Sequence, residues 1–185
     1  MVITTSPLVK TYTLQEFWDL PEPSDHSKLE LIKGVLYMTP PPDFPHNDAA
    51  SILDQRLRQE ITRCGYPGRI YIPRTAIWVD DDTYLEPDLM YISDELRRQM
   101  KPEHWTRADI VIEILSPSNA LYDRRTKSDT YQAMGVRELW LVDTETKHIE
   151  VRSFVAGKTA VYNLADLLRS EVLSNIGISV SEVFS

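Results

Sequence analysis

The sequence predicts an α/β protein in which a mixed central β-sheet is flanked by α-helices. Three observations support this. The order strand, helix, strand across residues 109–142 is that of a βαβ unit, whose two strands run parallel and side by side. Hairpin-like segments elsewhere add antiparallel strands. Residues 46–65 carry apolar side chains at the helical period. A two-layer or three-layer sandwich accommodates all of these elements.

The first elements are a short helix and an extended segment. Residues 11–20 fit an amphipathic helix with Thr13 as its N-cap. Its apolar face would comprise Leu14, Phe17 and Trp18. Residues 29–38 fit either one strand or a tight hairpin around Gly34.

A long helix and a strand pair follow. The helix at 46–65 would end at Gly65, a residue that adopts the left-handed conformation of a helix C-cap. Its apolar residues are Ile52, Leu53, Leu57 and Ile61. Residues 69–80 and 83–92 are typical of strands, and the acidic run at 80–82 suits a turn that joins them into a hairpin.

The C-terminal half contains the βαβ unit. Residues 94–100 fit a short helix and 109–115 a buried strand. The segment 116–135 fits a turn with an N-cap at Ser118 or Asn119, followed by a helix that ends at Gly135. Three further strands are expected at 137–143, 147–154 and 159–164.

Composition indicates a single globular domain over residues 1–185, with 42% hydrophobic and 26% charged residues. We expect no membrane span, because no apolar run reaches the roughly 20 residues that a membrane helix needs. The N-terminus lacks the apolar stretch of a secretory signal, and the one cysteine, Cys64, excludes an internal disulfide. These features predict a cytoplasmic protein. The net charge of −8 argues against coating nucleic acid by charge alone, but not against an enzyme with a local basic patch or a metal.

The most informative residue is Glu113, a carboxylate within an otherwise apolar strand. Side chains alternate between the two faces of a strand, so Glu113 shares its face with Asp109, Val111 and Leu115. An unpaired charge is costly to bury. Glu113 is therefore either a structural charge paired with an arginine or a helix end, or a functional group.

Asp88 supplies a partner for Glu113. It follows a proline, is flanked by apolar residues, and would meet Glu113 if the two strands were neighbours. Two close carboxylates are tolerated if they share a proton or hold a divalent cation, and oxygen ligands suit Mg²⁺ or Mn²⁺. Alternatively, Asp88 is a turn aspartate. Glu30 is either a third ligand or the outward residue of an edge strand.

A basic group is available on the helix that follows Glu113. Asp123, Lys127 and Tyr131 form a stripe at intervals of four residues, which can face the carboxylates. Lys127 could instead be a solvated lysine paired with Asp123. Arg124 could meet phosphate or water equally well, and His46 is either a contact near the site or a polar residue at a helix N-terminus.

Several other motifs are absent from the sequence. It has no Gly-rich phosphate loop, no Gly-x-Ser-x-Gly elbow and no His/Cys zinc spacing, which disfavours nucleotide-binding, esterase and zinc functions.

The combined pattern resembles the Uma2 family, within the PD-(D/E)-x-K group of nuclease-like proteins. The matching segments, in order, are LELIKG, MTPPPDFPHND, EPDLMYIS, DIVIEILSPSN, YDRRTKSDTYQAMGVRELWLVD and GISVSEVF. This resemblance implies a restriction-endonuclease-like core, with Asp88 and Glu113 as metal ligands and Glu30 as an additional acidic member. The usual lysine, two residues after the glutamate, is replaced here by Leu115. The resemblance implies that Lys127 takes over its charge.

Three functions remain open. The first is a Mg²⁺- or Mn²⁺-dependent endonuclease acting on DNA, with Asp88, Glu113 and Lys127 as catalytic residues and a homodimer as the assembly that cuts a duplex. The second is a catalytically inactive nuclease fold that binds DNA or protein. The third is a metal-free glycosidase with two carboxylates.

Overall fold

The computed structural model describes residues 10–115 and 123–185, which form two compact units. One unit comprises Met1–Pro41 and Val79–Leu85, and the other comprises Pro42–Trp78 and Glu86–Ser185. We describe each unit by itself. The predicted N-cap at Ser118 or Asn119 lies outside the described residues. The expectation of a single domain over the whole chain stays a prediction.

The smaller unit contains a short helix and a small sheet. Its elements are α1 (Leu14–Trp18), β1 (Lys28–Ile32), β2 (Val35–Thr39) and β5 (Thr83–Leu85). The last residue of β4 (Ile77–Val79) also belongs to this unit. The strands lie in the order β2-β1-β5-β4. The alternative of a hairpin around Gly34 is confirmed, since β1 and β2 pair antiparallel and Gly34 has a φ of +76°.

Helix α1 begins at the predicted N-cap, but its buried face contains fewer residues than predicted. Thr13 and Glu16 form a reciprocal capping box, in which each side chain accepts a hydrogen bond from the other residue's backbone N–H. Leu14 and Phe17 are buried, and the Phe17 ring lies 5.0 Å from that of Tyr84. The prediction that Trp18 shares this buried face is wrong, because Trp18 is 53% exposed. The helix ends at this residue, so Trp18 has no following turn to hold it against the core.

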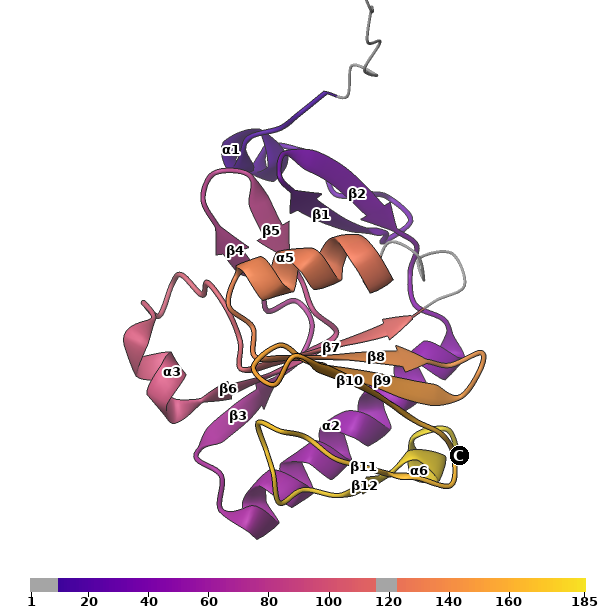
Figure 1. Ribbon diagram of the computed structural model, residues 1–185. Helices are drawn as coiled ribbons and strands as arrows, with labels where there is room; N and C mark the ends of the chain where they lie inside the picture. The colour runs from indigo at the N-terminus through magenta and orange to yellow at the C-terminus, as the bar shows by residue number, and fades with distance from the viewer. Residues whose placement is uncertain (1–9, 116–122) are drawn as a thin grey trace, which may run out of the picture. The chain divides into compact units, whose positions relative to one another are not determined.

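The larger unit is built on a six-stranded mixed sheet in the order β10-β9-β8-β7-β6-β3 (Figure 1). The pair β7–β8 is parallel and every other neighbouring pair is antiparallel. The strands are β3 (Gly68–Tyr71), β6 (Leu89–Ser93), β7 (Ile110–Leu115), β8 (Glu138–Asp143), β9 (His148–Ser153) and β10 (Lys158–Tyr162). The predicted α/β class and the βαβ unit are confirmed.

Helices cover both faces of this sheet. Helix α2 (Phe44–Cys64) lies on one face and α5 (Ser128–Ala133) on the other (Figure 1). The core between α2 and the sheet includes Leu53, Leu57, Ile112 and Trp140. A π-helical turn, η1 (Asp123–Lys127), precedes α5, and α3 (Asp94–Gln99) follows β6. Among the described residues, none of these helices is both long and apolar enough to cross a bilayer.

Predicted helix ends agree with the structure. Gly65 follows α2 with a φ of +69°, and Gly135 follows α5 with a φ of +83°. Both values lie in the left-handed region, where glycine has no Cβ penalty.

The prediction that residues 83–92 form one strand is wrong. Residues 86–88 interrupt it, and β5 and β6 belong to different sheets. Pro87 explains the interruption, because proline has no N–H to donate to a ladder. The prediction that residues 69–80 form one strand is also wrong, because residues 72–76 interrupt it. The predicted hairpin is therefore divided: β4 and β5 are neighbours in the small sheet, whereas β3 pairs with β6 in the large one.

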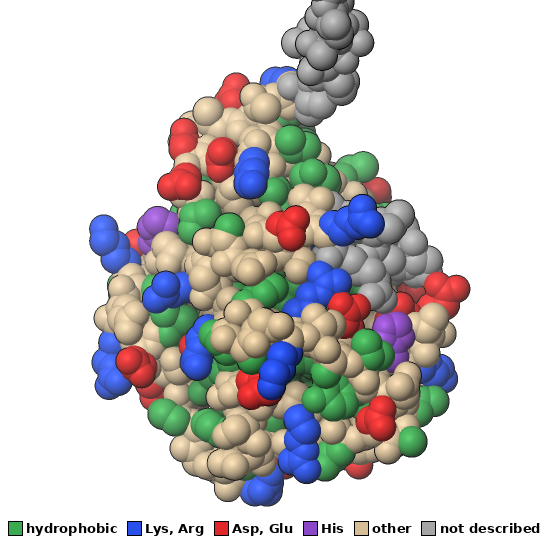
Figure 2. Space-filling model, in the orientation of Figure 1, with side chains coloured by type: hydrophobic (Ala, Val, Ile, Leu, Met, Phe, Trp, Pro, Cys, Tyr) green, Lys and Arg blue, Asp and Glu red, His purple; other side chains and the backbone are tan. Residues whose placement is uncertain are grey.

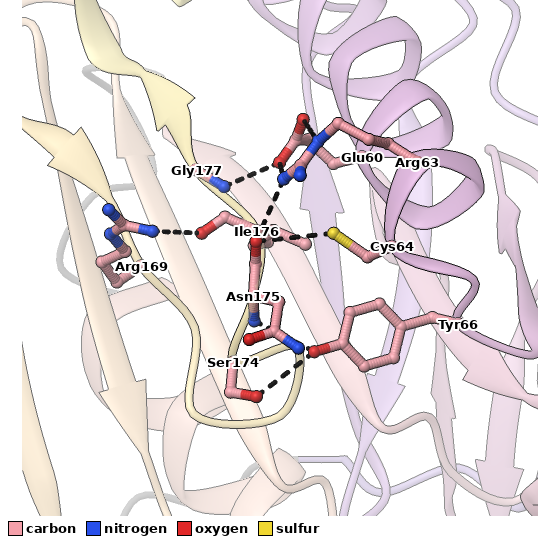
Figure 3. Close-up of polar contacts among 9 residues, drawn as sticks. All are labelled: Glu60, Arg63, Cys64, Tyr66, Arg169, Ser174, Asn175, Ile176 and Gly177. Atoms are coloured by element: carbon pink, nitrogen blue, oxygen red, sulfur yellow. Dashed lines mark hydrogen bonds and ion pairs between the residues drawn. The ribbon is translucent and has the colours of Figure 1, made fainter.

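The C-terminal segment is fixed to the end of α2 by polar contacts (Figure 3). It comprises β11 (Leu167–Leu168), β12 (Ile178–Ser179) and α6 (Val180–Val183). Glu60 accepts a hydrogen bond from the Gly177 N–H at 2.8 Å, and Arg63 donates to the Asn175 carbonyl at 3.0 Å. The Tyr66 hydroxyl accepts from the Asn175 N–H at 3.0 Å. These contacts anchor the helix at the end opposite to His46.

Candidate active site

The candidate site begins with two carboxylates on neighbouring strands. Glu113 is 2% exposed within β7. The antiparallel register of β6 and β7 pairs Leu89 with Ile112, so Asp88, one residue before β6, lies opposite Glu113. The Ile114 N–H donates to Oδ2 of Asp88 at 2.8 Å. The structure thus brings the two predicted carboxylates together.

The lysine reaches the same place from the helix. Nζ of Lys127 lies 3.1 Å from Oε1 of Glu113, and both side chains are 2% exposed. The hydroxyl of Tyr131 donates to the same oxygen, and this ring is fully buried. The spacing of four residues brings both donors onto one face of the helical segment, as predicted. Lys127 is therefore not a solvated surface lysine.

His46 contacts the other carboxylate. Asp43 caps α2 by accepting a hydrogen bond from the His46 N–H at 3.0 Å. Nε2 of His46 lies 3.3 Å from Oδ2 of Asp88. Nδ1 is buried and has no hydrogen-bond partner within the described ranges.

The remaining predicted residues belong to the smaller unit or lack a described side chain. Glu30 belongs to β1 in the smaller unit, is fully buried, and lies 3.6 Å from Nζ of Lys28. Its role as a third ligand stays a prediction. Arg124 belongs to η1, but its side chain lies outside the described part of the chain.

One member of the site was not predicted. It is the backbone N–H of Ile114, which donates a hydrogen bond to Asp88. This contact could have been predicted only if the register of β6 against β7 had been known.

The donor set fits a cation held by few protein ligands. Across residues 10–115 and 123–185, no group of three or more His, Cys, Asp or Glu side chains is arranged to hold a metal ion. Asp88 and Glu113 offer oxygen donors, and the Lys127 amine lies beside Glu113. Mg²⁺ is commonly bound by one or two carboxylates, with water and substrate phosphate completing its shell. The pair therefore suits Mg²⁺ or Mn²⁺.

A mixed sheet flanked by helices, with two carboxylates and a lysine at its centre, defines a restriction-endonuclease-like fold. A solved structure agrees: the crystal structure of "a putative nuclease belonging to DUF820 from Anabaena variabilis ATCC 29413" matches with a TM-score of 0.76 and 21% identity. The match covers 94% of this chain and 97% of that one.

The family is shown by the sequence match. The model of the Uma2 family, described as "Putative restriction endonuclease", matches residues 14–181, and the chain belongs to this family. A search of curated proteins gave no match. Membership indicates a nuclease rather than a glycosidase.

Proposed function

We propose that this protein is a Mg²⁺- or Mn²⁺-dependent endonuclease that hydrolyses phosphodiester bonds of DNA. One observation supports this most directly. Asp88 accepts a hydrogen bond from the N–H of Ile114, the residue next to Glu113 on β7, and the Lys127 amine lies 3.1 Å from Glu113. These are a divalent-cation donor pair and a positive charge, the two components that phosphoryl chemistry requires.

The protein groups have distinct roles in this proposal. Asp88 and Glu113 would hold the cation, and a role for Glu30, which belongs to the smaller unit, stays a prediction. The bound ion would polarise the phosphate and lower the pKa of a coordinated water. Lys127 would stabilise negative charge that develops on the phosphate. Tyr131 would orient Glu113.

His46 would keep Asp88 in place and, together with Arg124, contact substrate. We also expect a homodimer in the cytoplasm, because cutting both strands of a duplex takes two sites and two-fold dimers are common.

The test compares cleavage of plasmid and single-stranded DNA in Mn²⁺ by wild type, Asp88→Asn and Glu113→Gln. We expect each substitution to lower the rate by at least about a hundredfold. Asp109→Asn is the matched control. Asp109 is a buried carboxylate on the same face, four residues or roughly 13 Å along the strand, held by the Ser93 N–H and Arg137. Equal rates for all four proteins would refute the proposal.

A second function is favoured by the direct contacts within the site. Glu113 is ion-paired with Lys127, and Asp88 contacts His46. Carboxylates satisfied in this way suit a catalytically inactive nuclease fold that binds DNA or protein. Calorimetry with Mn²⁺ distinguishes the two functions. Binding that Glu113→Gln abolishes supports the endonuclease, and no binding at neutral pH supports the inactive module.

A further inference from the structure

The charge of this chain is distributed unevenly along the sequence. Residues 68–78 and 94–107 of the larger unit contain six Lys and Arg residues against three Asp and Glu, a net charge of +3. The whole chain has a net charge of −8, so the other 160 residues carry −11. Figure 2 shows Lys and Arg side chains over α3, at the left of the view. Because phosphate contacts supply most of the non-specific affinity for nucleic acid, such a local excess of positive charge matters in a chain that is acidic overall.

Four exposed cations on β3, on α3 and in the segment after α3 define what we call the basic surface: Arg69, Arg97, Arg98 and Lys101. Within the described ranges, Arg69, Arg98 and Lys101 form no ion pair. The exposed Arg58 of α2 differs, because it is paired with Asp54 at 2.8 Å. Salt bridges therefore do not neutralise the basic surface, and its charge is available to a partner.

The basic surface includes the face of the sheet that carries Glu113. Arg69 and Tyr71 share one face of β3, because side chains alternate along a strand. The strand registers align Tyr71, through Met90 of β6, with Val111 of β7. Val111 and Glu113 lie two residues apart on the same face of β7. Two strand spacings and two residues thus separate Tyr71 from Glu113, or about 12 Å, which is three to four base pairs of a duplex.

An aromatic cluster supports the basic surface. The Tyr71 ring lies 4.5 Å from the ring of Trp105, edge-on, and Trp78 stacks on His104 at 4.9 Å. A hydrogen bond that Arg97 donates to the Tyr71 side chain raises the pKa of the guanidinium. A side chain that is already held in position loses less conformational freedom when it binds a partner. The cluster therefore prepares Arg97 for an anionic ligand.

We propose that the basic surface binds the phosphate backbone of duplex DNA on one side of the bond that is cleaved. Its cations come from a strand, a helix and a loop, so they suit a polyanion that extends over a surface better than a single phosphate. Duplex DNA has one phosphate for about every 1.7 Å of its axis. The carboxylates of this stretch, Asp94, Glu95 and Glu103, reduce the positive charge but leave an excess of three. The inference rests on the proposed function, because it takes DNA as the substrate and specifies where that DNA is held.

Binding is measured by fluorescence anisotropy on a short labelled duplex, without divalent metal and at several salt concentrations. The logarithm of the association constant should fall linearly with the logarithm of the salt concentration for wild type. Arg98→Gln and Lys101→Gln should each reduce the magnitude of this slope by about 0.9, and the double variant by about 1.8. At low salt, the double variant should bind about ten- to a hundredfold more weakly than wild type.

Two control variants test whether position and charge both matter. Lys101→Arg keeps the charge and should keep the slope of wild type. Lys158→Gln removes an exposed lysine from β10, at the opposite edge of the sheet from β3, and should also bind like wild type. Thermal unfolding should be unchanged in all of these variants, because the substituted side chains are exposed.

Two results would overturn the inference. One is a salt dependence in the double variant equal to that of wild type. The other is an equal reduction of the slope by Lys158→Gln and Lys101→Gln, which would show an effect of net charge alone.

Cleavage assays in Mn²⁺ separate this inference from the proposed function. If wild type cleaves DNA and the double variant binds and cleaves it equally well, only the role of the basic surface is refuted. If the substitutions lower the slope but wild type does not cleave, the basic surface is supported and the endonuclease is refuted. If wild type neither binds nor cleaves DNA, both proposals are refuted.

Discussion

Replacing Lys127 with methionine should destabilise the protein by about 3–5 kcal/mol, because it leaves Glu113 with an uncompensated charge in the core. The structure supports a large effect. Both side chains are 2% exposed and their charged atoms lie 3.1 Å apart, so solvent screens the pair weakly. With an effective dielectric constant of about 20, the direct attraction is about 5 kcal/mol before the cost of desolvation. Tyr131 still donates to Glu113 in the variant, which limits the loss.

The measurement is urea unfolding at neutral pH without divalent metal, as a double-mutant cycle of Lys127→Met and Glu113→Gln. The double variant should be more stable than Lys127→Met alone, with a coupling energy of roughly 1–3 kcal/mol. The control is the exposed pair of Arg58 and Asp54, which should contribute less than about 1 kcal/mol. Additive effects in the Lys127 cycle, or a cost as small as that of the control, would refute the assignment of a buried ion pair.

Two further predictions concern the fold. Burial raises the pKa of Glu138, against the opposing effect of its hydrogen bonds with Ser170 and Glu171. The folded state therefore binds the Glu138 proton more tightly than the unfolded state, and stability contributed by the protonated group is lost as pH rises above the ordinary value of about 4.3. The measurement is the free energy of unfolding in urea for wild type and Glu138→Gln, at several pH values from acid to neutral. As the pH rises, wild type should lose stability relative to the variant; a difference between the two proteins that stays constant with pH would contradict the prediction. Gly68→Ala should cost about 1–3 kcal/mol in thermal unfolding, because its Cβ would lie 2.6 Å from the Tyr91 side chain; an unchanged melting temperature would show that β3 can shift.

The elements that could be predicted from sequence are those with a strong local pattern. In β7, Ile112 faces the core, and Glu113 is on the opposite face because successive side chains of a strand alternate between its two faces. The sequence pattern was enough to predict this. Glycines 65 and 135 marked helix ends because few other residues adopt a positive φ easily.

Features that depend on distant partners could not be predicted. Residues 83–92 look like one strand, yet local patterning does not reveal that β5 and β6 join different sheets. Nor does it reveal which side chains a short helix leaves in solvent, as the exposure of Trp18 shows. Within the site, the sequence indicated the carboxylates and the lysine. The hydrogen bond from Ile114 to Asp88 follows only from the strand register.

The position of the lysine has a consequence for how the site is built. Leu115 occupies the strand position where the wider superfamily places its lysine, and it is 3% exposed. The charge comes instead from the last residue of η1, a π-helical turn of the kind often found at functional sites. The β6–β7 ladder therefore sets the carboxylates, whereas the packing of η1 and α5 over β7 sets the lysine. Because the two parts rest on different elements, a change in the packing of α5 would move the positive charge and leave the carboxylate pair in place.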